Sequence, residues 1–279
     1  MAEHSCSLRA PNQRDPHSLE QELRWRRYGR QMLLPELGEA GQARLRGARA
    51  LIVGLGGLGS PAALYLAAAG VGHLYLSDGD KLEVSNLQRQ ILYSSNELND
   101  SKVKLASKRL KLLNPHVQLH PCPAVDDANW SALLAPEGKP VDLVLDASDN
   151  MATRQLVNLG CVRLGIPLLS AAASGWQGQL LLLDLRQQSQ AGCYHCLYPT
   201  RAEPTQNCRT AGILGPVVGM MGTLQALEAI KFLAAIASPA LGALQQFDGL
   251  SGRWQRMQLV ADPLCPVCGA AQASEGVTE

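Results

Sequence analysis

The sequence predicts an α/β protein in which a doubly wound, mostly parallel sheet is followed by a more antiparallel region. Three observations predict it. Apolar strand-like runs alternate with helix-like runs up to about residue 170, a glycine-rich turn follows the first strand, and strand-like runs dominate after residue 170. With 279 residues, of which 46% are hydrophobic, the chain can bury one large core. We therefore expect one unit whose second half packs on the first.

The first half predicts a strand, a glycine turn, a helix and a second strand, which form the first βαβ unit of such a sheet. The segments concerned are residues 48–53, 60–70 and 73–77. A helix is predicted over 101–113 and stops before Pro115, because proline cannot continue it. The runs VQLHPC (117–122) and VDLVLDASDN (141–150) supply two further strands.

After residue 170 the sequence predicts strands at GQLLLLDL (178–185) and RWQRMQLV (253–260), with a long helix over 217–236 between them. This helix is apolar enough to suggest a membrane span, but Gln225, Glu228 and Lys231 interrupt it. We therefore interpret it as a buried helix. No membrane is expected as a partner, and a cytoplasmic location is predicted.

The composition and the N-terminal residues exclude other classes. A net charge of +1 and an aromatic fraction of 4% provide neither a basic patch nor a stacking surface, so nucleic acid is not expected as a partner. Residues 1–19 are polar and contain proline, without the apolar stretch of a secretory signal. We predict that they form a disordered extension.

The glycine turn has the spacing G-x-G-x-x-G, in which backbone N–H groups and a helix dipole can approach a phosphate. Asp78 follows about 20 residues later, where a carboxylate typically binds a ribose hydroxyl. The pattern fits any adenosine-containing ligand, NAD and ATP alike, and a tight turn without a ligand is the alternative. The glycines of this loop are Gly54, Gly56, Gly57 and Gly59.

Polar residues after Asp78 favour a triphosphate. Asn86, Arg89 and Lys102 supply hydrogen-bond donors and positive charge within one short span. Such groups neutralise developing phosphate charge, which nicotinamide chemistry does not need. Taken separately, Arg89 and Lys102 fit solvated surface charges equally well, but together they favour a nucleotide site.

Two carboxylates end an apolar strand in VLDASDN, and ligands of open α/β sheets bind at this end of the strands. They are Asp146 and Asp149. Asp149 could hold Mg²⁺ against phosphates as a hard oxygen ligand. It could also be the N-cap of the helix that begins near Met151, and the two roles are compatible.

The chain has eight cysteines, of which four form two C-x-x-C pairs about 70 residues apart. Four thiolates suit a closed, tetrahedral, structural zinc site. His195 lies within the first pair and is expected to be a surface residue, while Cys6, Cys122 and Cys161 are expected to be exposed or core residues. The predicted zinc ligands are Cys193, Cys196, Cys265 and Cys268.

The remaining cysteine, Cys208, lies in QNCRTAGILG and could be a zinc ligand, a buried filler or a nucleophile. The set of four cysteines already fills a zinc shell, which argues against the first role. Arg209 beside it and Gly212 downstream favour an electropositive loop in which a thiolate forms more easily. We favour a reactive thiol, with the buried filler as the alternative.

Several of these segments together resemble the bacterial ThiF/MoeB family, relatives of the ubiquitin-activating enzymes. The resemblance runs from about residue 25 to 270, and NMATRQ, NCRTAG, GPVVGMMGTLQALEAIK and CPVCG are most similar to ThiF members. The other segments are GLGGLG, SDGDKLEVSNLQRQ and DASDNMATRQ. This implies a Rossmann-like, ubiquitin-activating-enzyme-like fold in a single domain over 20–279, with a nucleotide-binding half over 20–170 and a carrier-binding, zinc-containing half over 171–270.

The resemblance implies that ATP and Mg²⁺ adenylate the C-terminal glycine carboxylate of ThiS, a small ubiquitin-like sulfur carrier of thiamine biosynthesis. The adenosine site then matches the glycine loop with Asp78 and Asp80, and the magnesium aspartate matches Asp149. The phosphate contacts match Asn86, Arg89 and Lys102.

The family pattern also assigns roles beyond the nucleotide. Arg30 becomes an arginine finger that reaches the other subunit of a homodimer, and Cys208 can link to the carrier after activation. The sulfur donor would be a separate protein. The sequence departs from the family in its longer N-terminal extension and in ASDN, where Cys-Thr-Asp-Asn is common.

Three alternatives stay open. A MoeB-type enzyme would act on the small subunit of molybdopterin synthase. An NAD-dependent oxidoreductase would use the glycine loop but leave Asn86, Arg89 and Lys102 without a purpose. A zinc-stabilised binding module would show no turnover.

Overall fold

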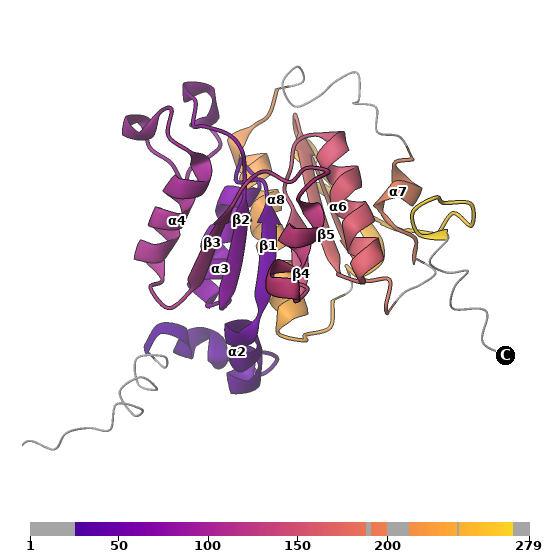
Figure 1. Cartoon of the computed structure of the whole chain (residues 1–279), viewed down its shortest axis with the longest axis horizontal. Coiled ribbons are helices and arrows are strands. Elements are labelled where there is room, and N and C mark those ends of the chain that lie inside the picture. The colour runs from indigo at the N-terminus through magenta and orange to yellow at the C-terminus, as the bar shows by residue number, and fades with distance from the viewer. Residues whose placement is uncertain (1–25, 188–190, 200–211, 239, 270–279) are drawn as a thin grey trace, which may run out of the picture.

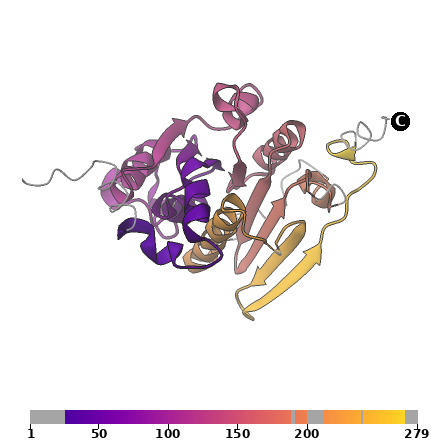
Figure 2. The same ribbon diagram turned by 90° about the horizontal axis from the view of Figure 1, so that it is seen from below.

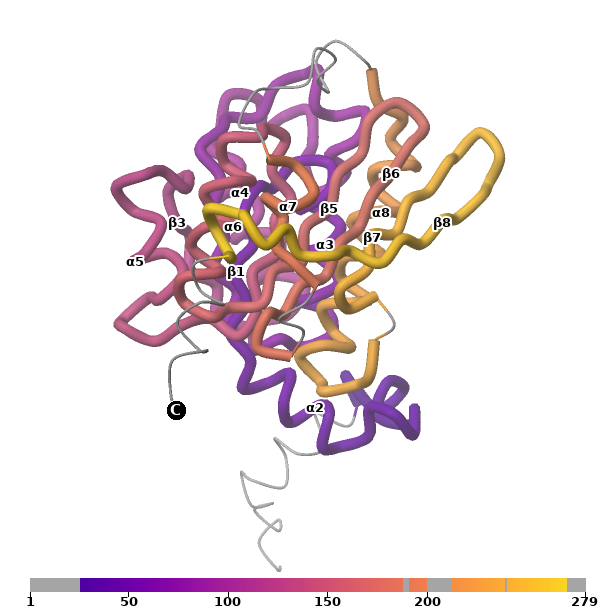
Figure 3. The backbone as a smooth tube through the Cα atoms, turned by 90° about the vertical axis from the view of Figure 1, so that its right-hand side faces the viewer, coloured from indigo at the N-terminus to yellow at the C-terminus, as the bar shows by residue number. Residues whose placement is uncertain are grey.

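The computed structural model describes residues 26–187, 191–199, 212–238 and 240–269. Its sheet has eight strands in the order β3-β2-β1-β4-β5-β6-β7-β8, of which β1 to β5 are labelled in Figure 1 and β6 to β8 in Figure 3. The first five strands in the chain pair in parallel and the last three pair antiparallel. The predicted fold class is confirmed. The strands are β1 (Arg49–Val53), β2 (His73–Ser77), β3 (Gln118–Cys122), β4 (Leu143–Asp146), β5 (Leu168–Ser174), β6 (Gln177–Leu183), β7 (Ala243–Asp248) and β8 (Arg253–Gln258).

Helices cover both faces of the sheet (Figures 1 and 2). Residues 26–32 are also helical, and three 3₁₀ turns, η1 (Val84–Asn86), η2 (Ser95–Glu97) and η3 (Pro136–Gly138), lie in the connections. The α-helices are α2 (Gly38–Gly47), α3 (Gly59–Ala69), α4 (Lys102–Leu113), α5 (Trp130–Leu134), α6 (Met151–Leu164), α7 (Tyr194–Leu197) and α8 (Gly215–Leu233).

Strand β1 shows why the parallel part of the sheet is apolar throughout. Ala50 and Ile52 belong to one buried cluster, with residues of α3, α4 and α8, whereas Leu51 and Val53 belong to a second, with residues of α5 and α6. Successive side chains of a strand point to opposite faces, so a strand covered on both sides needs a continuous apolar run. The carboxyl ends of these strands therefore project from a rigid, close-packed core.

The change to antiparallel pairing follows from the length of one connection. Only Gly175 and Trp176 join β5 to β6, and so short a link permits an antiparallel hairpin but no parallel crossover. Gly175 has a φ of +57°, which glycine adopts without strain. The antiparallel strands β7 and β8 then extend the sheet beyond β6 (Figure 2).

The boundaries agree closely with the predicted segments, but some elements were not predicted. The long helix begins two residues earlier than predicted, at Gly215, and ends at Leu233. Strands β5 and β7 and the short helices α2, α5 and α7 were not among the predicted elements. Within the described ranges, no helix combines the length and apolarity needed to cross a bilayer. Residues 1–19, predicted to be disordered, lie outside the described part of the chain.

Candidate functional site

The glycine loop joins the end of β1 to the start of α3 at the carboxyl edge of the parallel strands. Gly54 has a φ of +90°, and a Cβ there would lie 2.7 Å from the backbone oxygen of Ala147. A Cβ on Gly59 would lie 1.9 Å from the oxygen of Gly54. The N-terminus of α3 has no side-chain capping hydrogen bond. The loop thus leaves backbone N–H groups at the end of a helix, where an anion binds well.

We expect Gly59→Ala to destabilise the protein by about 1–3 kcal/mol, since the new methyl group would overlap backbone rather than a movable side chain. Urea denaturation would measure the free energy of unfolding. Gly219→Ala is the matched control, because a Cβ at Gly219 in α8 meets nothing within 4 Å and alanine favours a helix. Gly59→Ala with wild-type stability would contradict the close approach described above.

Asp78 connects the end of β2 to the glycine loop. Its carboxylate accepts hydrogen bonds from the backbone N–H of Leu55 and of Asp80, each at 2.7 Å. Burial raises the pKa of Asp78, and the positive charge of Lys102 partly offsets this. The Lys102 ammonium is buried and lies 2.8 Å from Oδ2 of the exposed Asp80. Three predicted site residues therefore lie together beside the loop.

The segment after β2 folds back over the glycine loop. Asn86 is buried in η1, where its Oδ1 accepts a hydrogen bond from the backbone N–H of Glu83 at 3.2 Å. A Cβ on Gly57 would lie 3.3 Å from Cγ of Arg89, whose Nη1 donates to the backbone oxygen of Ser85 at 2.9 Å. The side chain of Arg89 therefore starts at the loop, as a phosphate contact requires.

Gln90 joins this group, although no sequence motif indicates it. Its side chain is 3% exposed, and its Oε1 has no hydrogen-bond partner among the described residues. A Cβ on Gly56 would lie 3.5 Å from its Nε2. No sequence motif assigns Gln90 a role, so only the fold shows that this polar side chain is buried at the loop.

The turn between β4 and α6 carries Asp149, whose side chain is exposed. The N-cap of α6 is Asn150, whose Oδ1 accepts a hydrogen bond from the backbone N–H of Thr153 at 2.9 Å. The alternative reading of Asp149 as the helix cap was therefore wrong. The neighbouring amide takes the cap because its position directly precedes the first helical residue, which leaves the Asp149 carboxylate available to a ligand.

The other carboxylate of this strand end, Asp146, is buried and turned inward. Its Oδ1 accepts from the hydroxyl of Ser148 at 2.6 Å, and its Oδ2 accepts from the hydroxyl of Ser170 at 2.8 Å. Nη1 of the buried Arg154 lies 3.3 Å from the same Oδ2. Of the two carboxylates, only Asp149 faces solvent.

The structure does not test the roles of two further predicted residues. Arg30 is exposed in the helical stretch over 26–32, and the single chain does not test its predicted reach into a second subunit. Cys208 lies outside the described residues. Both assignments remain predictions.

The four predicted zinc ligands lie together. Their sulfur atoms are all within 4.8 Å of one another, with 3.8 Å between Cys193 and Cys265 and 3.5 Å between Cys196 and Cys268. Zn–S bonds of about 2.3 Å in a tetrahedron put the sulfur atoms about 3.8 Å apart, so the donor set fits zinc in number, type and spacing. Helix α7 and the last described residues meet here (Figures 1 and 3).

Burial raises the pKa of Cys193 to about 11, and burial together with the neighbouring Cys193 thiolate raises the pKa of Cys268. A cation among them would reverse this by stabilising the thiolates. Asn158 of α6 supports the cluster, since its Nδ2 lies 3.5 Å from Sγ of Cys193 and its Oδ1 accepts from the backbone N–H of Tyr194 at 2.9 Å. The metal site is therefore tied to α6.

Burial resolves the predictions for His195, Cys161 and Cys122, whereas Cys6 lies outside the described residues. His195 is partly exposed, and its Nδ1 lies 3.0 Å from Oε1 of Gln155 rather than among the sulfur atoms. Cys161 is buried in the core and Cys122 is half-buried, as expected of thiols without a site.

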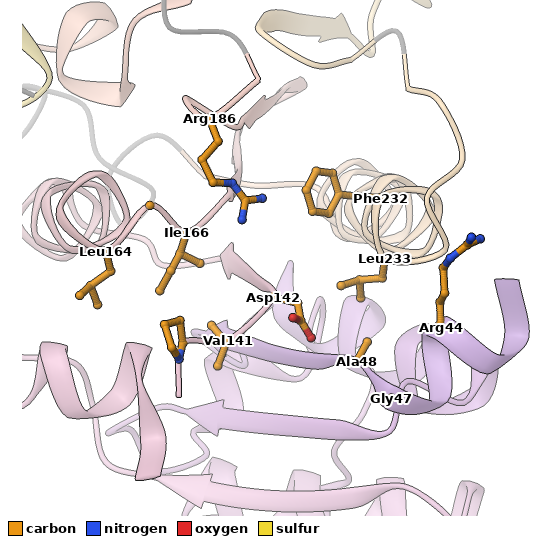
Figure 4. Close-up of a pocket in the computed structure, with 12 residues that line it drawn as sticks. Arg44, Gly47, Ala48, Val141, Asp142, Leu164, Ile166, Arg186, Phe232 and Leu233 are labelled. Atoms are coloured by element: carbon orange, nitrogen blue, oxygen red, sulfur yellow. The ribbon is translucent and has the colours of Figure 1, made fainter. Parts of the chain in front are cut away.

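A cavity of about 680 Å³ lies at the opposite edge of the sheet, near the amino ends of β1 and β4 (Figure 4). Its wall includes Asp142, which accepts a hydrogen bond from the backbone N–H of Arg49 at 2.8 Å, and Arg186, which is paired with the buried Asp184. None of the predicted site residues lines it. The candidate site is therefore the carboxyl edge, which carries the glycine loop, Asp78, Arg89, Lys102 and Asp149.

The sequence is similar to a known protein family and to several characterised proteins. The chain matches the ThiF family over residues 28–267. It is 49% identical over 247 residues to the sulfur carrier protein ThiS adenylyltransferase of Escherichia coli, covering 88% of this chain and 96% of that protein. It is 43% identical over 244 residues to the molybdopterin-synthase adenylyltransferase of E. coli, covering 87% and 96%.

Other relatives are longer, and solved structures support the fold. The chain is 49% identical over 213 residues to the adenylyltransferase and sulfurtransferase uba4 of Aspergillus fumigatus, covering 72% of this chain but only 42% of that protein. The structure of E. coli MccB with succinimide superposes with a TM-score of 0.72 at 24% identity, over 87% of this chain and 73% of that one. With its fold, glycine loop and cysteine pairs, the chain belongs to the ThiF family.

Proposed function

We propose that this protein is an adenylyltransferase that joins AMP from ATP to the C-terminal glycine carboxylate of a ThiS-like sulfur carrier and releases pyrophosphate. The observation that carries the proposal is the 49% identity to a ThiS adenylyltransferase across 96% of that relative's length. The nucleotide-binding half would be residues 20–170 and the carrier-binding half residues 171–270, within one domain over 20–279.

The carboxyl edge of the sheet supports this chemistry. The N-terminus of α3 would bind phosphate oxygens, and the Asp78 carboxylate would accept a hydrogen bond from a ribose hydroxyl. Asp80 and Asn86 lie nearby. Arg89 and Lys102 would contact the phosphates, and the buried amide of Gln90 could reach a ligand at the loop. These contacts suit ATP better than NAD, because Asn86, Arg89 and Lys102 supply hydrogen-bond donors and positive charge to a polyphosphate.

The reaction needs positioning and charge stabilisation rather than a protein nucleophile. The carrier's carboxylate would attack the α-phosphorus in line with the departing pyrophosphate, so an oxygen–phosphorus bond forms as another breaks. Mg²⁺, when held by Asp149, would neutralise charge on the phosphates. Arg89, Lys102 and Arg30 from a partner subunit of a homodimer would share this task. Cys208 would act only afterwards, when a separate donor protein supplies sulfur.

Mixing the purified protein with ATP, Mg²⁺ and ThiS is the direct test. We expect the intact mass of ThiS to rise by one adenylate, and a ThiS variant without its C-terminal glycine to stay unmodified. The small subunit of molybdopterin synthase is the matched second substrate, since the 43% identity to its adenylyltransferase favours it as the second candidate. Faster modification of that subunit would reverse the carrier assignment, and modification of neither would refute the proposed function.

A binding comparison separates the remaining alternative. An oxidoreductase would bind NAD more tightly than ATP, whereas an adenylyltransferase would prefer ATP. Isothermal titration with each nucleotide distinguishes the two.

A further inference from the structure

The turn that carries Asp149 is held by hydrogen bonds at each of the three residues before it. The backbone oxygen of Asp146 accepts from Nε2 of Gln225 in α8 at 3.0 Å, and the backbone N–H of Ala147 donates to Val53 at 2.8 Å. The backbone N–H of Ser148 donates to Oδ1 of Asp146 at 3.1 Å. The Asp149 carboxylate is thus an exposed group on a held backbone.

Arg154, one turn into α6, holds this segment from below. Its Nη2 donates to the backbone oxygens of Ser148 and Ala171, the latter at 2.9 Å. Its Nη1 donates to the hydroxyl of Ser170 at 3.0 Å and lies 3.3 Å from Oδ2 of Asp146. One guanidinium therefore bridges β4, β5 and the turn.

Stability alone does not account for this arrangement. Arg154 is 7% exposed and Asp146 is 1% exposed, and removing two charges from water costs about as much as their attraction returns. A buried ion pair is better explained by what its hydrogen bonds fix in place. Here they fix Ser148, whose backbone nitrogen would lie 3.1 Å from a Cβ on Gly54. The same peptide thus contacts the glycine loop.

We infer that Arg154 is a positioning residue: through Ser148 and Asp146 it sets the place of the Asp149 carboxylate relative to the glycine loop. This inference rests on the proposed function, in which Asp149 holds the divalent metal of the nucleotide complex. Asp149 itself makes the contact, and Arg154 acts through the turn. Arg154 was not among the candidate residues of the sequence, because a lone arginine in a helix carries no motif of its own.

Arg154→Lys tests the inference, since lysine retains the charge beside Asp146 but cannot bridge Ser148, Ser170 and Ala171 together. The readout is the affinity of the full-length protein for Mn²⁺·ATP, measured by electron paramagnetic resonance. We expect the dissociation constant to rise roughly 10- to 100-fold, as for lost support of a metal ligand. ATP binding in EDTA should stay within about twofold. Arg163→Lys, an exposed change on the same helix, is the matched control.

A double-mutant cycle separates positioning from general loosening. Once Asp149→Asn has removed the metal contact, adding Arg154→Lys should change the Mn²⁺·ATP dissociation constant by less than about twofold. Should Arg154→Lys fail to fold, Ser148→Ala removes only the 2.6 Å hydroxyl contact to Asp146 and should weaken Mn²⁺·ATP by about 2- to 10-fold.

The outcomes are distinct for the two proposals. A wild-type protein that binds Mn²⁺·ATP but adenylates no carrier would refute the proposed function and leave the positioning role supported if Arg154→Lys weakens the metal complex. The inference would be overturned if Arg154→Lys and Ser148→Ala both bound Mn²⁺·ATP with wild-type affinity. It would also be overturned if Arg154→Lys weakened ATP binding equally with and without metal, or if Arg154→Lys and Asp149→Asn had additive effects in the double-mutant cycle. A wild-type protein that binds no Mn²⁺·ATP would overturn it too.

Discussion

Asp149→Ala is expected to lower carrier-dependent exchange of pyrophosphate into ATP by at least about 100-fold while the protein stays folded. Loss of a group that stabilises transition-state charge costs on the order of 100- to 1,000-fold. The fold should persist because the side chain is exposed and Asn150, not Asp149, caps α6. The measurement is exchange of radiolabelled pyrophosphate with ThiS present, alongside circular dichroism.

The control is Glu39→Ala, which removes an exposed carboxylate from α2, on the chain segment that leads into the amino end of β1. It should exchange at the wild-type rate. Near-normal exchange in Asp149→Ala would remove this residue from the proposed metal site. It would also remove the basis for the role of Arg154, because that residue acts through Asp149.

Cys268→Ser is expected to abolish stoichiometric zinc binding and to lower the melting temperature. The cluster joins α7 to the C-terminal residues, and the metal would contribute the main cross-link there, since Cys193, Cys265 and Cys268 are buried without an extended apolar core of their own. A loss of at least about 3 kcal/mol corresponds to about 6–12 °C for a protein of this size. Metal analysis and calorimetry measure the two effects.

The matched control is Cys122→Ser, a change at a half-buried thiol outside the cluster. It should retain one zinc per chain and change the melting temperature little. Zinc retained at one per chain in Cys268→Ser would contradict the four-sulfur site. Loss of zinc without any loss of stability would instead show that the cluster is not structural.

The contact of Asn158 links the cysteine cluster to the helix that follows the Asp149 turn. Helix α6 begins at the turn that carries Asp149 and, at Asn158, hydrogen-bonds Cys193 and Tyr194 of the metal site. The nucleotide edge and the cysteine cluster therefore contact the same helix.

The spacing of residues in the sequence was enough to predict the features that lie within one short segment of the chain. Gly54 and Gly59 are required by a turn only a few residues long, and Asp78 follows at the distance set by one helix and one strand. Cys193 with Cys196, and Cys265 with Cys268, each form half of a site within one short segment. Such features are visible in the sequence because the constraint lies within the chain segment itself.

Tertiary structure alone decided which distant groups meet. Arg154 has partners in β4, β5 and the intervening turn, and it also contacts Tyr194 of α7. Gln90 is marked only by its burial at the loop, and the two cysteine pairs form one site because β7 and β8 return the chain to α7. The tertiary structure also showed that Asp146 is buried and hydrogen-bonded within the core, whereas Asp149, the carboxylate predicted to hold Mg²⁺, is exposed. Asp146 is the last residue of β4, whereas Asp149 lies in the turn beyond the strand. No local pattern encodes that difference, because it depends on what packs over the end of the strand.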